Sequence, residues 1–328
     1  MTLWVSKEMI DNLSALYSGK VVVVTGGGGY VGSALIHQLR KYNCKVIRTS
    51  RHGLQSIVSV EDKVLDLTRK DSWVEIVSIA DIIFHLAGNT SIAFAEENIE
   101  DSLLSNLAPI TNLVLASKKL NRCPKVIYAS TATVYGMTGS HPIVEETPAR
   151  PVSIYDLHKL YAEQYLTMAS DQGFITAKSL RLANVYGPSL SESSSKDRGI
   201  LSKVTKICLQ GGTINTYGGG DYLRDYIFID DVVKAFLCVG IYYSHHTTLN
   251  VASGIGTTVK EAFQMVLDEV EQSEGVRNRI EDIDWPPKSH MIDQRNFIAS
   301  NDKLKSVQGW DVTTHLKMGI RKLVKHYS

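Results

Sequence analysis

The chain has 328 residues, of which 44% are hydrophobic and 21% are charged, and its formal net charge is +1. This composition is typical of a globular protein and argues against disorder, and the small net charge provides no global attraction for nucleic acid or an anionic membrane. We expect no signal peptide, because Lys7, Glu8 and Asp11 interrupt the apolar run that one needs, and no segment approaches the ~20 apolar residues of a membrane span. The four cysteines are scattered, so we expect reduced thiols, no metal site and a cytoplasmic location.

Strands alternate with helices over the first 190 residues. The Val-Val-Val-Val run at 21–24 predicts a buried strand, because β-branched residues bounded by glycine suit a sheet covered on both faces. A helix is expected at 30–42, with Val31, Leu35 and Leu39 on one face. Further strands are expected at 45–49, 81–86, 125–130 and 176–182, and helices at 101–119 and 155–172. This alternation predicts an α/β fold with a doubly wound parallel sheet.

The sequence changes character after Gly187 and Pro188. A polar, serine-rich loop is expected at 189–195, a tight turn at 218–220 and a helix near 258–272. We therefore predict an N-terminal extension at 1–18 packed on the surface, a larger domain at 19–187 with later strands returning to it, and a smaller lobe at 188–328.

A glycine-rich turn at 25–32 joins the first predicted strand to the first predicted helix. It matches both G-x-x-G-x-x-G and, starting one residue later at Gly27, G-x-G-x-x-G. Without side chains the backbone can turn sharply and approach a pyrophosphate, whose charge meets the free N–H groups of the helix start. In this strand–turn–helix context a dinucleotide is favoured over a glycine loop without a ligand. The residues expected to contact the cofactor are Gly26, Gly29, Tyr30, Val31 and Gly32.

The residues after the second strand bear on the choice of cofactor. NAD sites usually place an acidic residue ~20 residues after the turn, on the ribose 2′-hydroxyl. No Asp or Glu occurs between Asp11 and Glu61, and the expected position carries Ser50 and Arg51. Because a guanidinium pairs with phosphate bidentately, these residues favour NADP(H) over NAD(H), although a solvated surface charge also explains Arg51. Farther on, Asp66, next to Leu67, is a candidate acceptor for the adenine amino group, and a strand-end turn explains it nearly as well.

Tyr155 and Lys159 lie four residues apart in a predicted helix, so both side chains share one face. A nearby ammonium favours the phenolate and lowers the pKa of a tyrosine. Tyr155 could then exchange a proton with an alcohol or ketone while hydride passes to or from a nicotinamide. Chance alone supplies about one such pair in a chain of this composition, so its meaning depends on context.

That context comes from motifs spread over nearly the whole chain. They include the glycine turn, Asn106, and the segments 85–88, 126–136, 181–188, 224–232, 250–254 and 299–310. With them the chain resembles the extended (atypical) short-chain dehydrogenase/reductases, and within these the nucleotide-sugar epimerase/dehydratase/reductase family. The resemblance implies an NAD(P)-binding Rossmann domain at 19–187 and, at 188–328, mainly a nucleotide-sugar substrate lobe.

The resemblance also implies individual roles. Thr131, Tyr155 and Lys159 would be catalytic, with Thr131 bonding the reacting sugar oxygen and Lys159 also holding the nicotinamide ribose. A plain strand threonine, and a surface ion pair of Arg224 with Asp225 or Asp230, are the alternative explanations for Thr131 and Arg224. The remaining expected contacts are Leu86, Ala87, Gly88 and Asn106 for the cofactor, and Asn184 and Arg224, with Thr131, for the substrate.

Ala132 and Thr133 restrict the chemistry. Similar 4,6-dehydratases carry an Asp-Glu pair at these positions, and neither residue here can act as an acid or base at neutral pH. The missing acidic residue after the second strand favours a 4-keto-sugar reductase, whereas the 130–136 segment favours an NAD-dependent C4 epimerase. A C4 dehydrogenase ranks third, and a non-catalytic cofactor sensor is the hypothesis from another class. The expected partners are a nucleotide-diphosphate sugar and a second copy in a homodimer, with no nucleic acid and no membrane.

Overall fold

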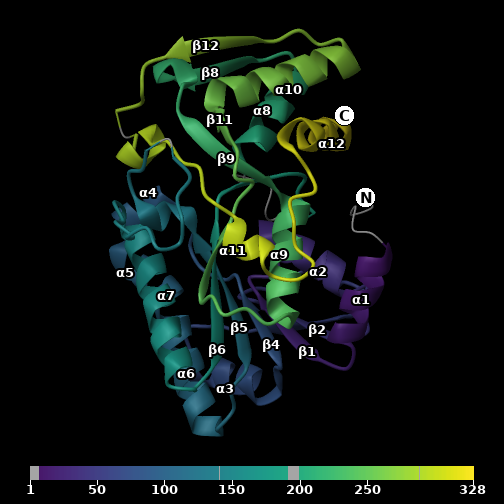
Figure 1. The fold of residues 1–328 in the computed structure, drawn as a ribbon, viewed down its shortest axis with the longest axis vertical. Helices are drawn as coiled ribbons and strands as arrows, with labels where there is room; N and C mark the ends of the chain where they lie inside the picture. The colour runs from purple at the N-terminus through teal and green to yellow at the C-terminus, as the bar shows by residue number, and fades with distance from the viewer. Residues whose placement is uncertain (1–6, 140, 191–198, 288) are drawn as a thin grey trace.

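The computed structural model describes residues 7–139, 141–190, 199–287 and 289–328, so most of the serine-rich loop expected at 189–195 lies outside the described residues. Its centre is a seven-stranded sheet in the order β10-β6-β5-β4-β1-β2-β3 (Figure 1). All neighbouring strands are parallel, which confirms the predicted doubly wound α/β fold. The strands are β1 (Val21–Thr25), β2 (Lys45–Ser50), β3 (Val60–Val64), β4 (Ile82–His85), β5 (Lys125–Thr131), β6 (Thr176–Leu182) and β10 (Thr248–Val251).

Helices cover both faces of this sheet, which is why the central strands β1 and β4 are almost entirely apolar (Figure 1). On one face Val22 and Val24 of β1 pack in a core with α2 (Tyr30–Leu39) and α9 (Ile229–Ile241). On the other face Val23 packs in a second core with α3 (Lys70–Ile79), α6 (Ala108–Leu120) and α7 (Ile154–Asp171). The valine run therefore joins two cores on opposite sides of the sheet.

The single helix expected at 101–119 is wrong, because the structure has two. These are α5 (Ile99–Asn106) and α6, separated at Leu107, and the short α4 (Ile92–Glu97) precedes them. Pro109 lies in the first turn of α6, where its missing N–H has no cost. In a continuous helix the same proline would remove a hydrogen bond and its ring would clash with the carbonyl of Ser105.

The segments after β6 build a smaller unit at the carboxyl ends of the large sheet, at the top of Figure 1. A three-stranded sheet has the order β11-β9-β7, and β12 pairs with β8. The chain nevertheless returns to the large sheet at β10. The elements of this part are β7 (Asn184–Tyr186), α8 (Ile200–Leu209), β8 (Thr213–Tyr217), η3 (Gly218–Gly220), β9 (Leu223–Phe228), β11 (Gly256–Thr258), α10 (Val259–Glu274), β12 (Arg279–Ile283), η4 (Met291–Gln294), α11 (Asp302–Lys305) and α12 (Leu316–Tyr327).

The N-terminal extension forms α1 (Lys7–Tyr17), which packs against α9. Leu13 and Tyr17 are fully buried, and the Tyr17 hydroxyl donates a hydrogen bond to the Leu237 carbonyl at 2.8 Å. The Tyr17 ring stacks on Tyr42, with 5.7 Å between centroids. The extension thus contributes to the core, which is more than the surface packing expected for it.

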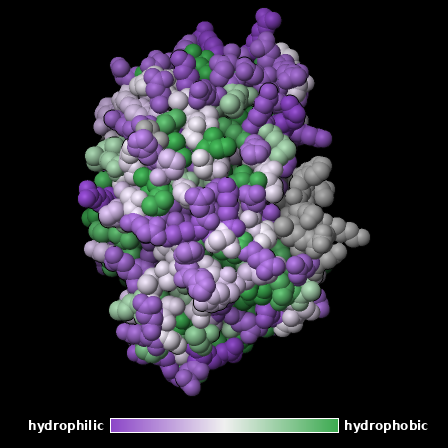
Figure 2. All heavy atoms as spheres, in the orientation of Figure 1, coloured by the Kyte–Doolittle hydropathy of each residue, from purple (hydrophilic) through white to green (hydrophobic). Residues whose placement is uncertain are grey.

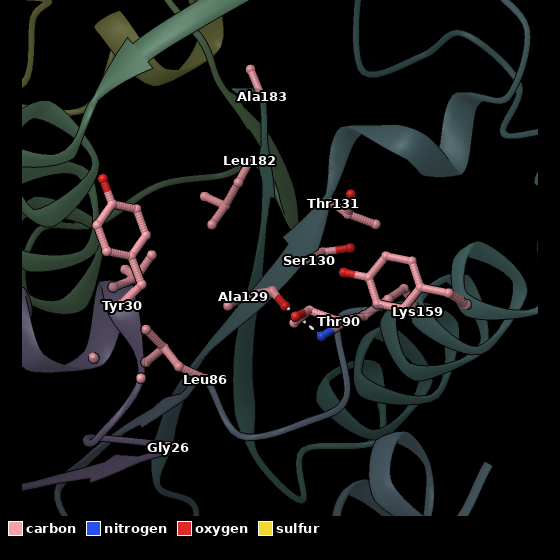
Figure 3. Close-up of a pocket in the computed structure, with 14 residues that line it drawn as sticks. Gly26, Tyr30, Leu86, Thr90, Ala129, Ser130, Thr131, Lys159, Leu182 and Ala183 are labelled. Carbon is pink, nitrogen blue, oxygen red and sulfur yellow. Dashed lines mark hydrogen bonds between the residues drawn. The ribbon is translucent and has the colours of Figure 1, made fainter. Parts of the chain in front are cut away.

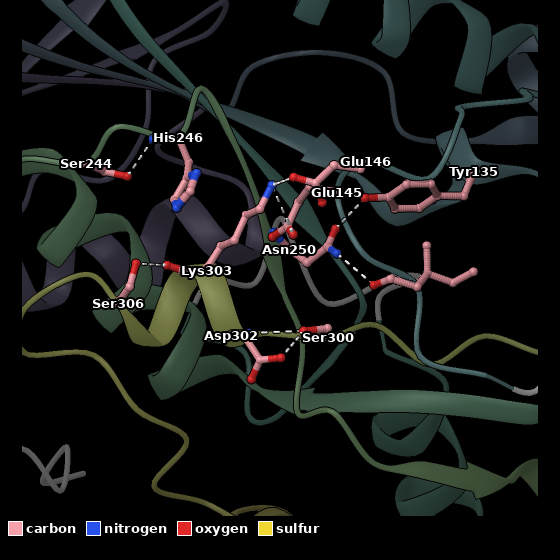
Figure 4. Close-up of polar contacts among 11 residues, drawn as sticks. Tyr135, Glu145, Glu146, Ser244, His246, Asn250, Ser300, Asp302, Lys303 and Ser306 are labelled. Carbon is pink, nitrogen blue, oxygen red and sulfur yellow. Dashed lines mark hydrogen bonds and ion pairs between the residues drawn. The ribbon is translucent and has the colours of Figure 1, made fainter.

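A polar cluster fastens the C-terminal segment to the end of the large sheet (Figure 4). Lys303 of α11 pairs with Glu146, and its Nζ lies 3.9 Å from a Glu145 oxygen. Glu145 also accepts the N–H of Asn250, whose side chain accepts the Tyr135 hydroxyl at 2.8 Å. Because Tyr135 ends η1 (Ala132–Tyr135), the short helix that follows β5, this cluster fixes the segment beside the candidate site.

The described part of the chain contains no helix that is both long and apolar enough to cross a membrane. On the face drawn in Figure 2, hydrophobic side chains occur in small groups among hydrophilic ones.

Candidate active site

A pocket opens beyond the carboxyl ends of β1, β4, β5 and β6 (Figure 3), where open α/β sheets bind their ligands. It brings together residues that the sequence places far apart: Tyr30 lies on one side, and Thr131 and Lys159 lie on the other. The lining also includes Thr90, Ala129, Leu182 and Ala183, which were not predicted: Ala129 lies within β5, Leu182 and Ala183 lie at and just after the end of β6, and Thr90 lies in the loop that follows β4. The full lining is Gly26, Gly29, Tyr30, Val31, Gly32, Leu86, Thr90, Ala129, Ser130, Thr131, Tyr155, Lys159, Leu182 and Ala183.

The glycine turn has the shape that a pyrophosphate needs. Gly26 has φ +66°, and a Cβ there would lie 2.7 Å from the backbone nitrogen of Ala87. A Cβ on Gly32 would collide with the carbonyl oxygen of Gly26. Gly29 is the N-cap of α2, and within the described residues it provides no side-chain cap for the N–H groups of this helix start. The residues present therefore fit the dinucleotide predicted for this turn.

Gly32→Ala should unfold the turn locally and weaken cofactor binding by tenfold or more, because the added Cβ must displace backbone that has no space to move. Isothermal titration with NADPH and NADH would measure this. Gly53→Ala is the matched control, since a Cβ at Gly53 meets nothing within 4 Å. Equal affinity of the two variants would contradict the assigned role of the turn.

The residues after β2 lie where the adenosine half of the cofactor is expected. Ser50 ends the strand and its hydroxyl donates to the His52 carbonyl at 2.5 Å, and Arg51 is exposed. Arg48 is buried and pairs with Asp62 of β3 through two hydrogen bonds of 2.5 and 2.9 Å. An acidic side chain thus does reach this region, and its charge is neutralised by Arg48. No local pattern predicted this pair, because only the register of β2 on β3 sets Asp62 opposite Arg48.

Asp66 serves at least as a turn residue. Its carboxylate accepts the Thr68 N–H at 2.9 Å and the Thr68 hydroxyl at 2.7 Å. These hydrogen bonds, together with the weaker effect of the Arg69 and Arg51 charges, lower the pKa of Asp66. Leu67 beside it is buried. Asp66 and Leu67 do not line the pocket. The predicted cofactor contacts that do line it are those of the glycine turn, Leu86, Tyr155 and Lys159.

Helix α7 positions the tyrosine and the lysine. Both side chains are buried, and the Lys159 ammonium donates to the Ala129 carbonyl at 2.9 Å. The same ammonium lies 4.7 Å from the centre of the Tyr128 ring and 6.0 Å from that of Tyr155. In these dry surroundings a positive charge so close to the phenol favours the phenolate.

Asn106 and His85 lie behind the lysine. Asn106 is buried at the end of α5 and donates to the Ser102 carbonyl at 3.0 Å, while its Oδ1 faces Gly88. His85 is fully buried, shares a 2.7 Å hydrogen bond with Thr25 and stacks on Tyr128. Burial, together with the charge of Lys159, lowers the pKa of His85 to about 3. The imidazole is therefore neutral at physiological pH. It packs behind Lys159 without placing a second positive charge beside the ammonium.

His85 should make the protein sensitive to acid. The unfolded state takes up a proton near the ordinary histidine pKa of about 6.5, whereas the folded state does so only near 3. Stability is therefore fully present above about 6.5 and is lost as the pH falls towards 3. Urea unfolding of wild type and His85→Phe between pH 7 and pH 4 should show a smaller decline for the variant. Parallel declines would contradict this origin.

The hydroxyl residues at the end of β5 point in different directions. The Thr131 hydroxyl accepts the Thr133 N–H at 3.2 Å and shares a 2.7 Å hydrogen bond with the Thr133 hydroxyl. Ser130 donates to Glu163, which is held by two atoms of Arg181, with a shortest distance of 2.6 Å. Ser130 is thus committed to a buried ion pair, and Thr131 remains at the pocket wall.

Asn184 and Arg224 lie in the smaller unit, outside the lining of the pocket. Asn184 begins β7 and is half-buried. Arg224 of β9 donates to the carbonyls of Leu223, Asp293 and Arg295, and burial lowers its pKa. The alternative partners are engaged elsewhere: Asp225 accepts hydrogen bonds from Ser253, Gly254 and Ala299, and Asp230 lies near the charges of Lys322 and Lys41.

Arg295 is a second buried cation, and the sequence did not single it out. It is 5% exposed, and its Nη1 has no hydrogen-bond partner among the described residues. Its guanidinium lies 4.9 Å from the Phe297 ring centre. Burial, and then the charge of Arg224, lowers its pKa to about 10. Two buried guanidiniums near each other are typical of a site that binds an anion.

Comparison with known proteins places this arrangement in a family. Residues 22–252 match the model of the NAD dependent epimerase/dehydratase family. The chain is 27% identical to a UDP-glucose 4-epimerase of Mycolicibacterium smegmatis, over 93% of this chain and 97% of that protein. It is also 27% identical to a dTDP-4-dehydro-6-deoxyglucose reductase of Escherichia coli, over 93% of this chain and 96% of that protein. A Thermotoga maritima UDP-glucose 4-epimerase solved with UDP-glucose has a TM-score of 0.82 at 26% identity, covering 94% and 98% of the two chains.

These matches confirm the family resemblance, and they agree with the site, whose glycine turn fits a dinucleotide. The chain belongs to the NAD dependent epimerase/dehydratase family of extended short-chain dehydrogenase/reductases, and it is an enzyme of the nucleotide-sugar epimerase and reductase group that uses a nicotinamide cofactor.

Proposed function

We propose that this enzyme reduces the 4-keto group of a nucleotide-diphosphate sugar with NADPH. The observation that carries the proposal is the end of β2. Ser50 and Arg51 stand where an NAD site needs a free carboxylate, and the carboxylate of Asp62 is occupied by Arg48. A 2′-phosphate would meet a hydroxyl and an exposed guanidinium there, with no uncompensated negative charge from Asp62.

In this proposal Tyr155 is the general acid. Its phenol gives a proton to the sugar oxygen, and the adjacent Lys159 ammonium stabilises the phenolate that remains. Thr131, at the end of β5, orients the same sugar oxygen through its hydroxyl. When bound, the cofactor supplies the hydride for the sugar carbon. The Ala129 carbonyl, 2.9 Å from Lys159, holds the ammonium in place between phenol and cofactor.

The substrate class is supported by the two buried arginines of the smaller unit. Backbone carbonyls accept hydrogen bonds from the Arg224 guanidinium, and Nη1 of Arg295 lacks a partner in the part of the chain that the structure describes. A diphosphate would supply the missing acceptors. The relatives named above act, by their names, on UDP-linked and dTDP-linked sugars.

The second candidate is an NAD-dependent C4 epimerase, which is favoured by the number of epimerases among the similar proteins. Mass spectrometry of small molecules released from the purified, denatured protein distinguishes the two. An epimerase returns its cofactor to the starting state in each cycle and should retain stoichiometric NAD through purification. A reductase should be isolated largely empty and be stabilised against heat more by NADPH than by NADH. Retained NAD would overturn the reductase proposal.

We also propose a homodimer formed by α5, α6 and α7. These helices pack on one another along one side of the large sheet (Figure 1) and expose several large apolar side chains. Leu115→Glu should convert the dimer into a monomer in sedimentation equilibrium, whereas Val58→Glu, a charge added at an exposed position outside these helices, should not. A wild type that is monomeric at micromolar concentration would contradict the proposal. The exposed residues are Ile99, Leu103, Leu104, Leu115, Tyr161 and Met168.

A further inference from the structure

A line of hydroxyl groups connects the pocket to a buried carboxylate. The Thr131 hydroxyl, which lines the pocket, hydrogen-bonds the Thr133 hydroxyl at 2.7 Å. Thr133 in turn donates to Oδ1 of Asp156. The other carboxylate oxygen, Oδ2, accepts the Ser153 hydroxyl at 2.7 Å. Asp156 directly follows Tyr155 on α7, so one carboxylate lies next to the tyrosine in the chain and is joined to Thr131 by a single intervening hydroxyl.

The surroundings of Asp156 make its protonation state sensitive to small changes. The residue is fully buried, and this burial raises its pKa, while the hydrogen bonds from Thr133 and Ser153 act in the opposite direction. The charged groups that face it are Arg295 and His290, from the segment around η4. At the same helix start the Glu96 carboxylate of α4 accepts the Ile154 N–H at 2.8 Å. Arg295 and His290 thus lower the pKa of Asp156, in the direction opposite to the effect of burial.

The direction of the hydrogen bonds along this line depends on Asp156. An ionised carboxylate can only accept, so the Thr133 hydroxyl must donate to it, and Thr133 then accepts the proton of Thr131. The Thr131 oxygen is left to accept a hydrogen bond from a sugar alcohol. With Asp156 protonated, each donor can reverse, and the Thr131 proton is free to point at a sugar ketone. The two substrate forms of a carbonyl/alcohol reaction need these two opposite arrangements.

We propose that Asp156 is a positioning residue that sets, through Thr133, the direction in which the Thr131 hydroxyl donates, and so matches it to the ketone or the alcohol. This inference rests on the proposed redox reaction at a sugar carbon. Neither Ala132 nor Thr133 is an acid or a base at neutral pH. The Thr133 hydroxyl is nevertheless hydrogen-bonded to a carboxylate, that of Asp156 on α7. Asp156 does not touch the substrate and transfers no atom to it.

The expected kinetics follow from the two arrangements. Reduction of the ketone should become faster as the pH falls through the pKa of Asp156, and oxidation of the alcohol should become faster as the pH rises through it. Asp156→Asn should remove this pH dependence in both directions and lower kcat about 10- to 100-fold with little change in KM. Thr133→Val should have the same effect, and Thr133→Ser should restore near-normal behaviour because it keeps the hydroxyl.

A double-mutant cycle tests whether the two residues act as one unit. Thr133→Val combined with Asp156→Asn should lower kcat no further than either change alone. Thr205→Val is the matched control, because it deletes a buried threonine hydroxyl that, among the described residues, donates within α8 to the Leu201 carbonyl at 2.8 Å. It should cost some stability and leave the pH profile unchanged. Multiplying losses in the double variant, or an unaltered pH profile in Asp156→Asn, would overturn the proposal.

A measurement without turnover separates this proposal from the proposed function. Carbon-13 NMR titration of the aspartate carboxyls, with the Asp156 signal identified by its loss in Asp156→Asn, follows the group directly in the free protein. Thr133→Val should raise the pKa of Asp156 because a hydrogen bond to the ionised form is lost, and Thr131→Val should raise it by a smaller amount. If no nucleotide sugar turns over, the proposed function fails while this titration still decides the coupling. An Asp156 pKa that is the same in Thr131→Val as in wild type would overturn the inference even in an active enzyme.

Discussion

Tyr155→Phe should lower kcat about 10²- to 10⁴-fold while leaving cofactor affinity within a few-fold of wild type. The substitution deletes one hydroxyl from a buried ring and leaves the Lys159 hydrogen bond to Ala129 in place. Hydrogen-bonding geometry around the ammonium is therefore retained, and only the proton donor is lost. Steady-state kinetics together with cofactor titration would measure the two effects separately.

The control for this variant lies on the same helix. Tyr161→Phe removes the same hydroxyl from a tyrosine that is 44% exposed, and its kcat should match that of wild type. Lys159→Met should resemble Tyr155→Phe in kcat. It should also weaken cofactor binding, since Lys159 is assigned both to stabilising the Tyr155 phenolate and to holding the nicotinamide ribose. A Tyr155→Phe enzyme with normal kcat would remove the tyrosine from the chemistry.

Local patterns predicted the parts of the site that lie within one element or at its end. The glycine turn, the Tyr155–Lys159 pair and the strand-end Thr131 each consist of residue types at fixed spacing on one element, and the parallel sheet then brings strand ends together. The break in the helix at 101–119 also had a local signal, Pro109, which the apolar pattern around it outweighed.

Three unpredicted residues, Asp62, Asp156 and Arg295, depend on contacts between distant elements. Asp62 meets Arg48 only because β2 and β3 pair in that register, and the neutralisation of its charge has no trace in either segment alone. Asp156 was hidden for the same reason, although it is the neighbour of Tyr155 in the chain. Its meaning comes from Thr133, which the packing of α7 against η1 brings within hydrogen-bond distance. Arg295 follows no motif and gains its place through the fold of the smaller unit.

Arg181→Met should destabilise the fold by about 3–5 kcal/mol, because it leaves the Glu163 carboxylate buried without its partner. The two side chains are 7% and 4% exposed, and the guanidinium also lies 4.6 Å from the Tyr135 ring centre. Urea unfolding at pH 7 would measure the loss.

Two further variants show whether the loss of stability in Arg181→Met comes from the buried, unpaired Glu163 charge or from the loss of the ion-pair contact itself. Arg277→Met breaks an ion pair whose side chains are 88% and 53% exposed, so it should change the unfolding free energy by less than about 1 kcal/mol. The double change Arg181→Met and Glu163→Leu replaces the whole buried pair by apolar groups and should recover most of the stability. It should not recover full activity, because Ser130, which also lines the pocket, then loses the Glu163 acceptor that holds its hydroxyl. A freed Ser130 hydroxyl would compete with Thr131 for the same sugar oxygen.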